Sequence, residues 1–596
     1  MCGITGLYTF NKNETLRISH IERATNILSL RGPDCGNFYN DSLTALGHRR
    51  LSIIDTSAAA NQPMADKTGR YLIVFNGEIF NFKELAASYL TNSGGTGDGI
   101  RSHSDTEVLL NLLIKYGTEC LTWLSGFFAF AFYDRETGDM ILARDRFGKK
   151  PLLYYQTDSY LAFASEMKSL LAWDIPRKLD YNTLEAYLQL NYVPPDQSML
   201  EGVKKVQPGT YLQINQSGVT AGVYYELRTR PEDYGQYSYE QAKTRFVELM
   251  DHAVQERLIA DVPLGAFLSG GIDSSVIVAL ASRHTSHLNT FSVGYKDNSF
   301  FDETSYAELV ARKFATNHTV FSLSNDDFLE HVYDVLDYLD EPFADSSAIP
   351  TYILCRRTRS KVTVALSGDG GDEIFSGYNK HAAEWRTRQK NLANTMVTAG
   401  LPIWKLMPRS HNNRLTNMFR QLHRFAEGSR LSVSDRYWRW ASVSPLTQAR
   451  ELLSKGSLDQ IDVRHTEQLK RDILKGIKTD DFNEILLTDM KLVLPGDMLV
   501  KVDMMSMANS LEVRSPFLDY KVVDFAFGLP ASYKIQDGLK KKIVQDAFRP
   551  MLPPELYNRP KHGFEIPLSG WLKKELWGLI DEDLLASGFI KEQGIF

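Results

Sequence analysis

The sequence predicts an α+β N-terminal part, followed by an α/β part with a parallel sheet and a helical C-terminal region. Up to about residue 225, short apolar runs such as 71–80 (YLIVFNGEIF) alternate with turns and with helical stretches such as 104–117. From residue 262, apolar runs lead into glycine turns and then into helical stretches, which indicates βαβ units. From residue 378 the pattern is mostly helical.

The N-terminal strands are expected where apolar residues alternate or run together between turns, at 3–10, 71–80, 127–134, 140–145 and 160–166. Residues 91–99 (TNSGGTGDG) are small and polar, so we expect a surface loop there. Segment 226–239 is polar, contains a proline and a glycine, and precedes a long helical pattern. We therefore expect it to link two domains, 1–225 and 240–596.

The second part is expected to place strands at 262–268, at 289–295 (NTFSVGY) and at the start of 361–373 (KVTVALSGDGGDE). Parallel strands joined by helices bring their carboxyl ends to one edge of the sheet, where ligands bind. The polar residues that follow these strands are therefore candidates for a binding site.

Composition and charge narrow the classes of protein. A chain of 596 residues accommodates about four domains of ~150 residues, or two larger ones. The net charge of −6 and the absence of a long basic run argue against a nucleic-acid partner. The longest apolar run, 126–133, is far shorter than the ~20 residues that a membrane span needs. The N-terminus does not resemble a signal peptide, so we expect no membrane partner.

The four cysteines lie far apart and lack CxxC spacing; they are Cys2, Cys35, Cys120 and Cys355. That distribution argues against a zinc ribbon, an iron–sulfur site or a secreted disulfide framework, and it favours a reducing cytoplasm. Cys2 by itself is most simply a packing cysteine. Removal of Met1, however, would place a free α-amine (pKa ~8) on the residue that carries the thiol (pKa ~8.5), so that one residue supplies nucleophile and base.

Five motifs in the first 200 residues occur in a specific order: MCGITG (1–6), RGPDCG (31–36), GHRRLSIID (47–55), FNGEIFN (75–81) and SDTE (104–107). Together they resemble the class II glutamine amidotransferase domain, an N-terminal-nucleophile hydrolase with an αββα sandwich. The resemblance implies that Cys2 attacks the side-chain amide of glutamine. Asn76, through its amide, and Gly77, through its backbone N–H, would form the oxyanion hole.

The resemblance also implies a glutamine site. Arg50 would pair with the substrate α-carboxylate, to which a planar guanidinium is well suited, and Glu78 and Asp105 would hold the α-ammonium. The full set of implied glutamine-binding residues is Arg50, Leu51, Ile53, Asn76, Glu78 and Asp105.

A second candidate site is 269–275 (SGGIDSS), which follows a buried-strand pattern and precedes a helical one. Glycines allow close backbone approach, hydroxyl and N–H groups converge on phosphate oxygens, and the helix N-terminus adds partial positive charge. No Walker A sequence competes, because Gly148-Lys149 is followed by Lys150. Alone, the motif is equally compatible with a plain strand–turn–helix.

The motif occurs with 367–373 (SGDGGDE), 510–519 (SLEVRSPFLD) and 559–567 (RPKHGFEIP). SGGIDSS resembles the ATP pyrophosphatase loop, and the set is similar to the asparagine synthetase family over about residues 240–590. The implied catalytic residues here are Asp369 and Lys561, and the implied Mg²⁺ ligands are Asp273 and Asp372. The implied ATP-binding residues are Leu268, Ser269, Gly270, Gly271, Asp273, Ser274, Ser275, Val293, Ser367 and Gly368.

The chemistry that the resemblance implies is amide formation driven by ATP. A carboxylate attacks the α-phosphorus of ATP, pyrophosphate leaves, and ammonia from the first site displaces AMP through an interior channel. The carboxylates of Asp369, Asp372 and Glu373 would repel a triphosphate unless a cation intervened, which favours Mg²⁺ as a cofactor. A homodimer is the family expectation, and its members usually extend a few dozen residues beyond the position of Phe596.

The leading prediction is a glutamine-dependent asparagine synthetase with aspartate as acceptor. Asp369 departs from aspartate-specific members, which usually carry glutamate there, so a sugar uronic acid of surface-polysaccharide assembly is the alternative acceptor. β-Lactam-forming relatives lack a working glutaminase cysteine, and a non-catalytic binder needs no nucleophile; both are disfavoured. A tRNA-modifying relative is disfavoured because CxxC is absent. His284 and His287 are interpreted as a polar helix end rather than a metal pair.

Overall fold

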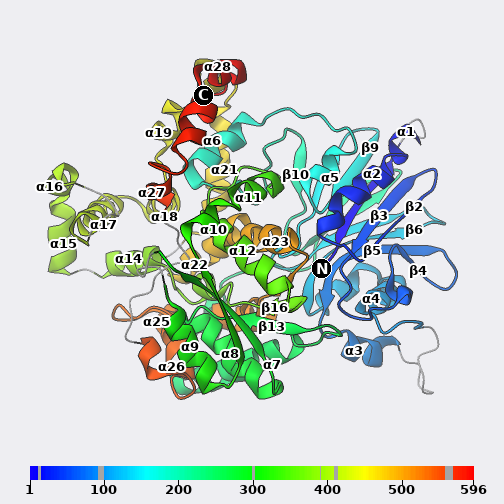
Figure 1. Cartoon of the computed structure of the whole chain (residues 1–596), viewed down its shortest axis with the longest axis horizontal. Helices are drawn as coiled ribbons and strands as arrows, with labels where there is room; N and C mark the ends of the chain where they lie inside the picture. Colours follow the sequence, from blue (N-terminus) through cyan, green and yellow to red (C-terminus); the bar gives the residue numbers. More distant parts are fainter. Residues whose placement is uncertain are drawn as a thin grey trace.

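A computed structural model describes residues 1–10, 15–90, 100–297, 302–389, 391–408, 414–478, 480–557 and 568–596. Figure 1 shows an N-terminal part rich in strands beside a larger part rich in helices, with the N-terminus at the junction between them. The expected surface loop at 91–99 lies outside the described residues. No helix in the described ranges is long and apolar enough to cross a bilayer.

The N-terminal part contains two six-stranded antiparallel sheets. The first has the order β10-β8-β9-β1-β3-β2, with β1 (Gly3–Thr9), β2 (Cys35–Asn40), β3 (Thr44–Arg50), β8 (Leu153–Gln156), β9 (Tyr160–Ala164) and β10 (Val203–Lys205). The second has the order β12-β11-β7-β6-β5-β4, with β4 (Met64–Ala65), β5 (Tyr71–Ile79), β6 (Gly126–Asp134), β7 (Met140–Arg144), β11 (Thr210–Asn215) and β12 (Gly218–Val223).

The two sheets pack face to face, and helices cover their outer faces. In β6 the alternation is visible in the sequence: Phe128 and Phe130 pack outward under α4 (Asp105–Tyr116), whereas Ala129 and Ala131 face the other sheet. The outer face of the first sheet packs against α2 (Ile21–Asn26) and α5 (Met167–Leu171). The αββα sandwich is therefore confirmed.

The C-terminal part is built on a five-stranded parallel sheet in the order β15-β14-β13-β16-β17. The strands are β13 (Leu264–Phe267), β14 (Asn289–Tyr295), β15 (Asn317–Leu323), β16 (Val364–Leu366) and β17 (Glu512–Arg514). One face packs against α7 (Tyr239–Glu256) and α8 (Ile272–His284), and the other against α12 (Ala348–Arg359) and α23 (Leu499–Met507).

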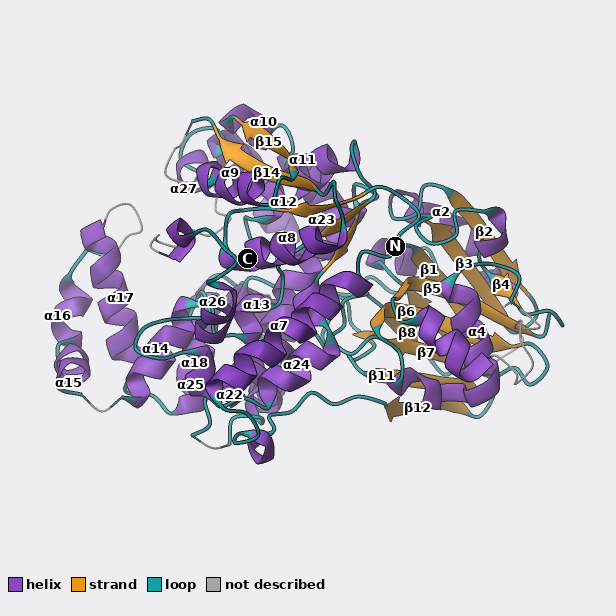
Figure 2. Cartoon of the chain, turned by 90° about the horizontal axis from the view of Figure 1, so that it is seen from below, coloured by secondary structure: helices purple, strands orange, loops and turns teal. Residues whose placement is uncertain are grey.

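The strand order reverses between β13 and β16, so that the loops after these two strands diverge around one crevice. Ligands bind at such a switch point in open α/β sheets. Both glycine motifs identified in the sequence follow these strands, SGG after β13 and SGDGG after β16. Beyond β16 the described chain is almost entirely helical, as expected, and α15 (Leu392–Ala399), α16 (Leu401–Leu406) and α17 (Arg414–Gly428) project from the body (Figures 1 and 2).

Candidate active sites

Cys2 lies just before β1, an interior strand of the first sheet, with only 7% of its surface exposed. Its backbone N–H donates to Oδ1 of Asn76, on β5 of the second sheet, over 2.9 Å. The Nδ2 of Asn76 is buried and has no hydrogen-bond partner among the described residues. A buried amide donor without a partner beside a thiol is the arrangement that an oxyanion hole needs.

Gly77 follows Asn76 on β5 and must be glycine for steric reasons. A Cβ there would clash with the carbonyl oxygen of Phe127 on β6. The sequence therefore brings a backbone N–H and the Asn76 amide to neighbouring positions on the strand that faces Cys2.

Burial raises the pKa of the Cys2 thiol, and the N-terminal ammonium nearby works in the opposite direction. In this structure that ammonium belongs to Met1 and pairs with Glu512 of β17 over 2.7 Å. Removal of Met1 would transfer the amine to the Cys2 nitrogen, which Asn76 already holds. The thiol then has its base on the same residue.

Arg50, at the end of β3, is 5% exposed and is held by the loop that follows it. Its guanidinium donates to the carbonyl of Ser57 over 2.7 Å and to Oδ1 of Asn61 over 2.8 Å. The carbonyl of Leu51 lies 4.0 Å from the Cys2 sulfur, and Ile53 is buried beside it in the same core. Arg50, Leu51 and Ile53 thus belong to one segment of the chain, which approaches Cys2 through the Leu51 carbonyl.

Glu78 and Asp105 are two buried carboxylates near this loop, on β5 and at the first position of α4. Asp105 accepts from the backbone N–H of Ile79 over 2.9 Å. Burial raises the pKa of Asp105 to about 6 and raises the pKa of Glu78 well above its usual value. A bound ammonium group would offset the cost of burying both charges, which fits the implied role.

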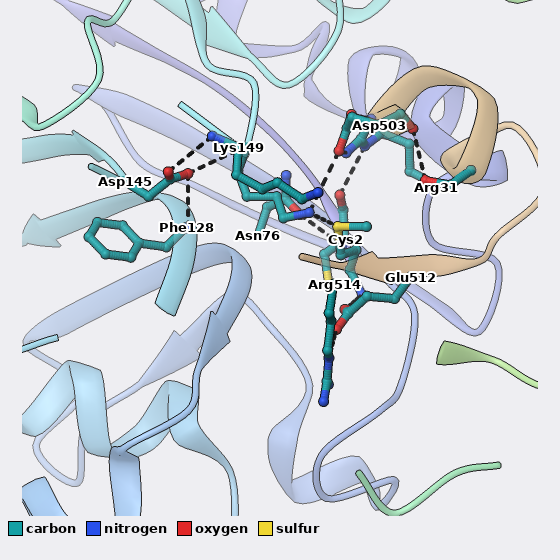
Figure 3. Close-up of polar contacts among 12 residues, drawn as sticks. Cys2, Arg31, Asn76, Phe128, Asp145, Lys149, Asp503, Glu512 and Arg514 are labelled. Carbon is teal, nitrogen blue, oxygen red and sulfur yellow. Dashed lines mark hydrogen bonds and ion pairs between the residues drawn. The ribbon is translucent and has the colours of Figure 1, made fainter. Parts of the chain in front are cut away.

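Four charged residues of this site were not identified from the sequence, and three of them come from the C-terminal part. Arg31 donates to the Cys2 carbonyl over 3.0 Å and pairs with Asp503 of α23 over 2.7 Å. Arg514 of β17 donates to Glu512 over 2.6 Å and lies 3.8 Å from Glu78. Figure 3 shows these side chains around Cys2. Arg31 and the Glu512–Arg514 pair were inside quoted motifs, but no local pattern indicated their partners.

The second site is the loop between β13 and α8. Gly270 has a φ of +71°, and a Cβ there would lie 2.6 Å from Cβ of Tyr306, so glycine is required twice over. The Oγ atoms of Ser269 and Ser274 lie 3.1 Å apart, and Gly271 forms the N-cap of α8. The N–H groups at the start of this 13-residue helix therefore face the crevice at the switch point.

The loop after β16 packs directly onto the start of α8. A Cβ on Gly368 would lie 2.8 Å from Cβ of Asp273, which explains the close approach of the two motifs. Ser367 donates through Oγ to Oδ2 of Asp369 over 2.6 Å. Leu268 is buried at the end of β13 and Val293 is 9% exposed on β14. The structure brings these predicted ATP-site residues together.

Asp273 and Asp372 meet at Lys541, a residue that sequence reasoning missed. The Lys541 ammonium contacts Asp273 and lies 2.7 Å from Oδ1 of Asp372. Burial acts the other way, but the two carboxylates raise the pKa of Lys541. The carboxylates thus already share one cation position, and Mg²⁺ bound by one or two carboxylates plus phosphates fits them. The described residues contain no group of three metal-ligating side chains.

Two other expectations are affected by the structure. Glu373 does not face the crevice, because it is 1% exposed and accepts from the Tyr378 hydroxyl, and burial raises its pKa to about 7. His284 pairs with Asp251 over 3.1 Å at the end of α8, which agrees with a polar helix end. Lys561, with all of 558–567, lies outside the described residues.

Comparisons with known proteins cover nearly the whole chain. Residues 1–225 match the family model described as "Glutamine amidotransferase domain", and 245–596 match the one described as "Asparagine synthase". The chain is 31% identical to "Asparagine synthetase [glutamine-hydrolyzing] 1" of Bacillus subtilis (strain 168), over 97% of this chain and 88% of that protein. It is 33% identical to "Putative asparagine synthetase [glutamine-hydrolyzing]" of Mycobacterium bovis, over 93% and 85%. It is 25% identical to "Amidase chry2" of Gibberella zeae, over 96% and 90%.

Proposed function

The chain belongs to the asparagine synthase family, and on that basis we propose that it is a glutamine-dependent asparagine synthetase. It would convert L-aspartate, L-glutamine, ATP and water to L-asparagine, L-glutamate, AMP and diphosphate. The family itself makes the chain an ATP-dependent ligase that takes nitrogen from glutamine. The aspartate acceptor, magnesium and the residue roles are the parts that we propose.

One observation supports the joint use of the two sites. Strand β17 begins at Glu512, which pairs with the N-terminal amine beside Cys2, and it is followed by Ser515, whose Oγ lies 3.2 Å from Oγ of Ser367 in the ATP loop. The same short strand therefore borders both sites. Ammonia released at Cys2 needs only a short path to reach an activated carboxyl at the sheet edge.

In the first half-reaction, the Cys2 thiol transfers its proton to the α-amine of the same residue and attacks the side-chain carbon of glutamine. The oxyanion that forms is stabilised by Nδ2 of Asn76 and by the N–H of Gly77. The α-ammonium of Cys2 returns its proton to the leaving nitrogen, so that collapse of this intermediate forms a γ-glutamyl thioester and releases ammonia. Water then hydrolyses the thioester to glutamate and regenerates the thiol. Glu78 and Asp105 hold the substrate ammonium.

In the second half-reaction, an oxygen of the acceptor carboxylate attacks the α-phosphorus of ATP, and the bond to the bridging oxygen of pyrophosphate breaks. The N–H groups of Gly270 and Gly271 and the start of α8 receive the phosphates. Magnesium, held by Asp273 and Asp372, would screen phosphate charge. Ammonia then attacks the acyl carbon and AMP leaves. We assign Lys561 to charge stabilisation on the adenylate, and Asp369 to the acceptor.

The identity of the acceptor carboxylate is the most specific part of the proposal. Relatives named asparagine synthetase support aspartate, whereas a relative named amidase matches over 96% of the chain. A uronic acid is the second candidate acceptor, on the ground of the short Asp369 side chain, which is bonded to Ser367. The proposal also includes a cytoplasmic location, which cell fractionation tests, and a homodimer, which light scattering of the purified protein tests.

The deciding experiment measures pyrophosphate release from ATP with magnesium and ammonium, with and without aspartate. Release that requires aspartate, with asparagine as product, would establish the proposal. Asp273→Asn should lose this release but keep glutamine hydrolysis, which controls for folding. Release with glucuronate or galacturonate, and not with aspartate, would replace the acceptor. An unchanged signal in Asp273→Asn would remove that residue from the ATP site.

A further inference from the structure

Lys149 is a residue of the N-terminal part whose side chain reaches the loop beside the ATP site. It lies in the loop between β7 and β8, only 2% exposed, and its ammonium donates to Oγ of Ser515 over 2.8 Å. Ser515 follows β17 of the parallel sheet. A buried lysine that crosses between two parts of a protein incurs a large desolvation cost, so its charge needs a partner.

The loop that carries Lys149 is fixed by a single carboxylate. Oδ1 of Asp145 accepts from the backbone N–H groups of Phe147 and Lys149, over 3.1 and 3.0 Å. Oδ2 accepts from those of Phe128 and Lys150, over 3.3 and 2.9 Å. Figure 3 shows Asp145 holding this backbone. The backbone of Lys149 is therefore held in place by hydrogen bonds, and its side chain extends to Ser515.

The contacts beyond Lys149 form a chain whose direction is determined by chemistry. An ammonium only donates, so Ser515 accepts from Lys149 and its own hydroxyl hydrogen is available for Oγ of Ser367, 3.2 Å away. The hydroxyl of Ser367 in turn donates to Oδ2 of Asp369 over 2.6 Å. A cation at one end and a carboxylate at the other polarise both hydroxyl groups in the same direction.

The electrostatic interaction between Lys149 and Asp369 agrees with this hydrogen-bonded chain. Burial lowers the pKa of Lys149 to about 8, and Asp369 is the group that counteracts this most strongly. Besides this hydrogen bond, the Lys149 ammonium makes a cation–π contact with Phe127, whose ring centroid lies 5.6 Å from Nζ. On its other side Lys149 lines a cavity of about 90 Å³ between the two parts, with Gly148, Leu499 and Asp503.

We propose that Lys149 is a positioning residue of the synthetase site: through Ser515 and Ser367 it orients Asp369 toward the acceptor carboxylate. The inference rests on the proposed function. It extends that function by making the second reaction depend on a side chain of the glutaminase part. It also accounts for the bond that ties the short carboxylate of Asp369 to Ser367.

The test compares Lys149→Met with the wild type in two assays. Acceptor-dependent pyrophosphate release, driven by ammonium, should fall about 10- to 100-fold in kcat, the range for losing a charged hydrogen bond. Glutamine hydrolysis without ATP, and the KM for ATP, should stay unchanged. Ser515→Ala should cause a similar loss, and the double variant should lose little more, because both act on Asp369.

The matched control is Lys205→Met. Lys205 also belongs to the N-terminal part and pairs across the junction with Glu341 over 2.8 Å, but the other oxygen of Glu341 accepts from the backbone N–H of Met199 over 2.8 Å, back in the N-terminal part. If Lys205→Met lost pyrophosphate release equally, Lys149 would act only by joining the two parts, and the proposal would be overturned. If Lys149→Met kept full release, it would be overturned directly.

A pH profile separates positioning from packing. Acceptor-dependent exchange of labelled pyrophosphate into ATP needs no ammonia, so its pH dependence reports on the synthetase site alone. The wild type should lose exchange as the pH rises through about 8, where Lys149 becomes neutral, and Lys149→Met should lack this decline. A decline retained in Lys149→Met would contradict the assignment. Wild-type protein inactive with aspartate, glucuronate and galacturonate would instead overturn the proposed function, and Lys149's role with it.

Discussion

Replacing Asn76 with alanine should nearly abolish glutamine hydrolysis while leaving the fold intact. The amide has one bond in the described structure, from the Cys2 N–H to Oδ1, and its Nδ2 is buried without a partner. Loss of this bond leaves the buried Cys2 N–H unpaired and costs about 1–3 kcal/mol, whereas removal of the unsatisfied buried Nδ2 relieves about 1–3 kcal/mol. The free energy of unfolding should therefore remain within about 2 kcal/mol of the wild-type value.

Catalysis should respond very differently. A donor that binds the oxyanion contributes about 2.7–4 kcal/mol to the transition state, so kcat for glutamine should fall ~10²- to 10³-fold. Ammonium-dependent synthesis should be unaffected. The assays are glutamate release under saturating glutamine and urea-induced unfolding of the same preparation.

Asn81→Ala is the matched control, because both atoms of that amide are paired. Its Nδ2 donates to the Trp123 carbonyl over 3.0 Å and its Oδ1 accepts from the Ser125 N–H over 2.9 Å. This variant should lose about 1–3 kcal/mol of stability and keep its kcat for glutamine. The oxyanion assignment would be refuted if Asn76→Ala retained more than about a tenth of wild-type kcat.

Three further outcomes are expected. Cys2→Ala should abolish glutamine-dependent synthesis and spare ammonium-dependent synthesis; a parallel loss of both rates would contradict the separation of the two sites. The KM for glutamine should rise as the pH falls through about 6, because protonated Asp105 no longer attracts an ammonium group, and Asp105→Asn should be insensitive to pH in that range. Arg31→Met should destabilise the protein by about 3–5 kcal/mol in urea unfolding, since buried Asp503 and Glu166 both lose their hydrogen-bonded arginine. Exposed Arg23→Met should cost at most about 1 kcal/mol, and equal losses would argue against a buried network.

Much of the fold could be predicted because burial leaves a periodic record in the sequence. The Phe/Ala alternation of β6 reports a strand buried on both faces, and the runs before the two glycine motifs report β13 and β16. Strand β17 was not predicted. Its residues Glu512 and Arg514 are charged, which is not typical of a buried strand, and they are buried only because each has a partner of opposite charge.

The site residues fall into two groups: those in local motifs, which could be predicted, and those that depend on partners distant in the sequence, which could not. Asn76, Gly77 and the SGG turn are local, so the chemistry and the backbone geometry lie within a few neighbouring positions of the chain. Pairs such as Arg31 with Asp503 join residues 472 positions apart, and no local pattern encodes them. Lys541 was hidden for the same reason, since a lysine in a basic run usually faces solvent. The division of the chain at 225 and 240 remains a prediction.

Strand β17 provides a structural connection between the Cys2 site and the ATP site. Burial alone would raise the pKa of Glu512, but the N-terminal ammonium and then Arg514 hold it at about 2. Removal of Met1 would move the first cation to the Cys2 nitrogen and leave Arg514 and Lys150 to neutralise the carboxylate. From Glu512 to Ser515 a strand rises about 10 Å, at ~3.3 Å per residue.

Opposite this strand, adjacent residues of one loop face the two sites: Lys150 lies 3.7 Å from Asp503 beside Cys2, and Lys149 reaches Ser515. Two rigid segments, each in contact with both sites, connect them over this distance without any moving domain. This loop and strand β17 therefore connect the surroundings of Cys2 to Ser515 and, through Ser367, to Asp369.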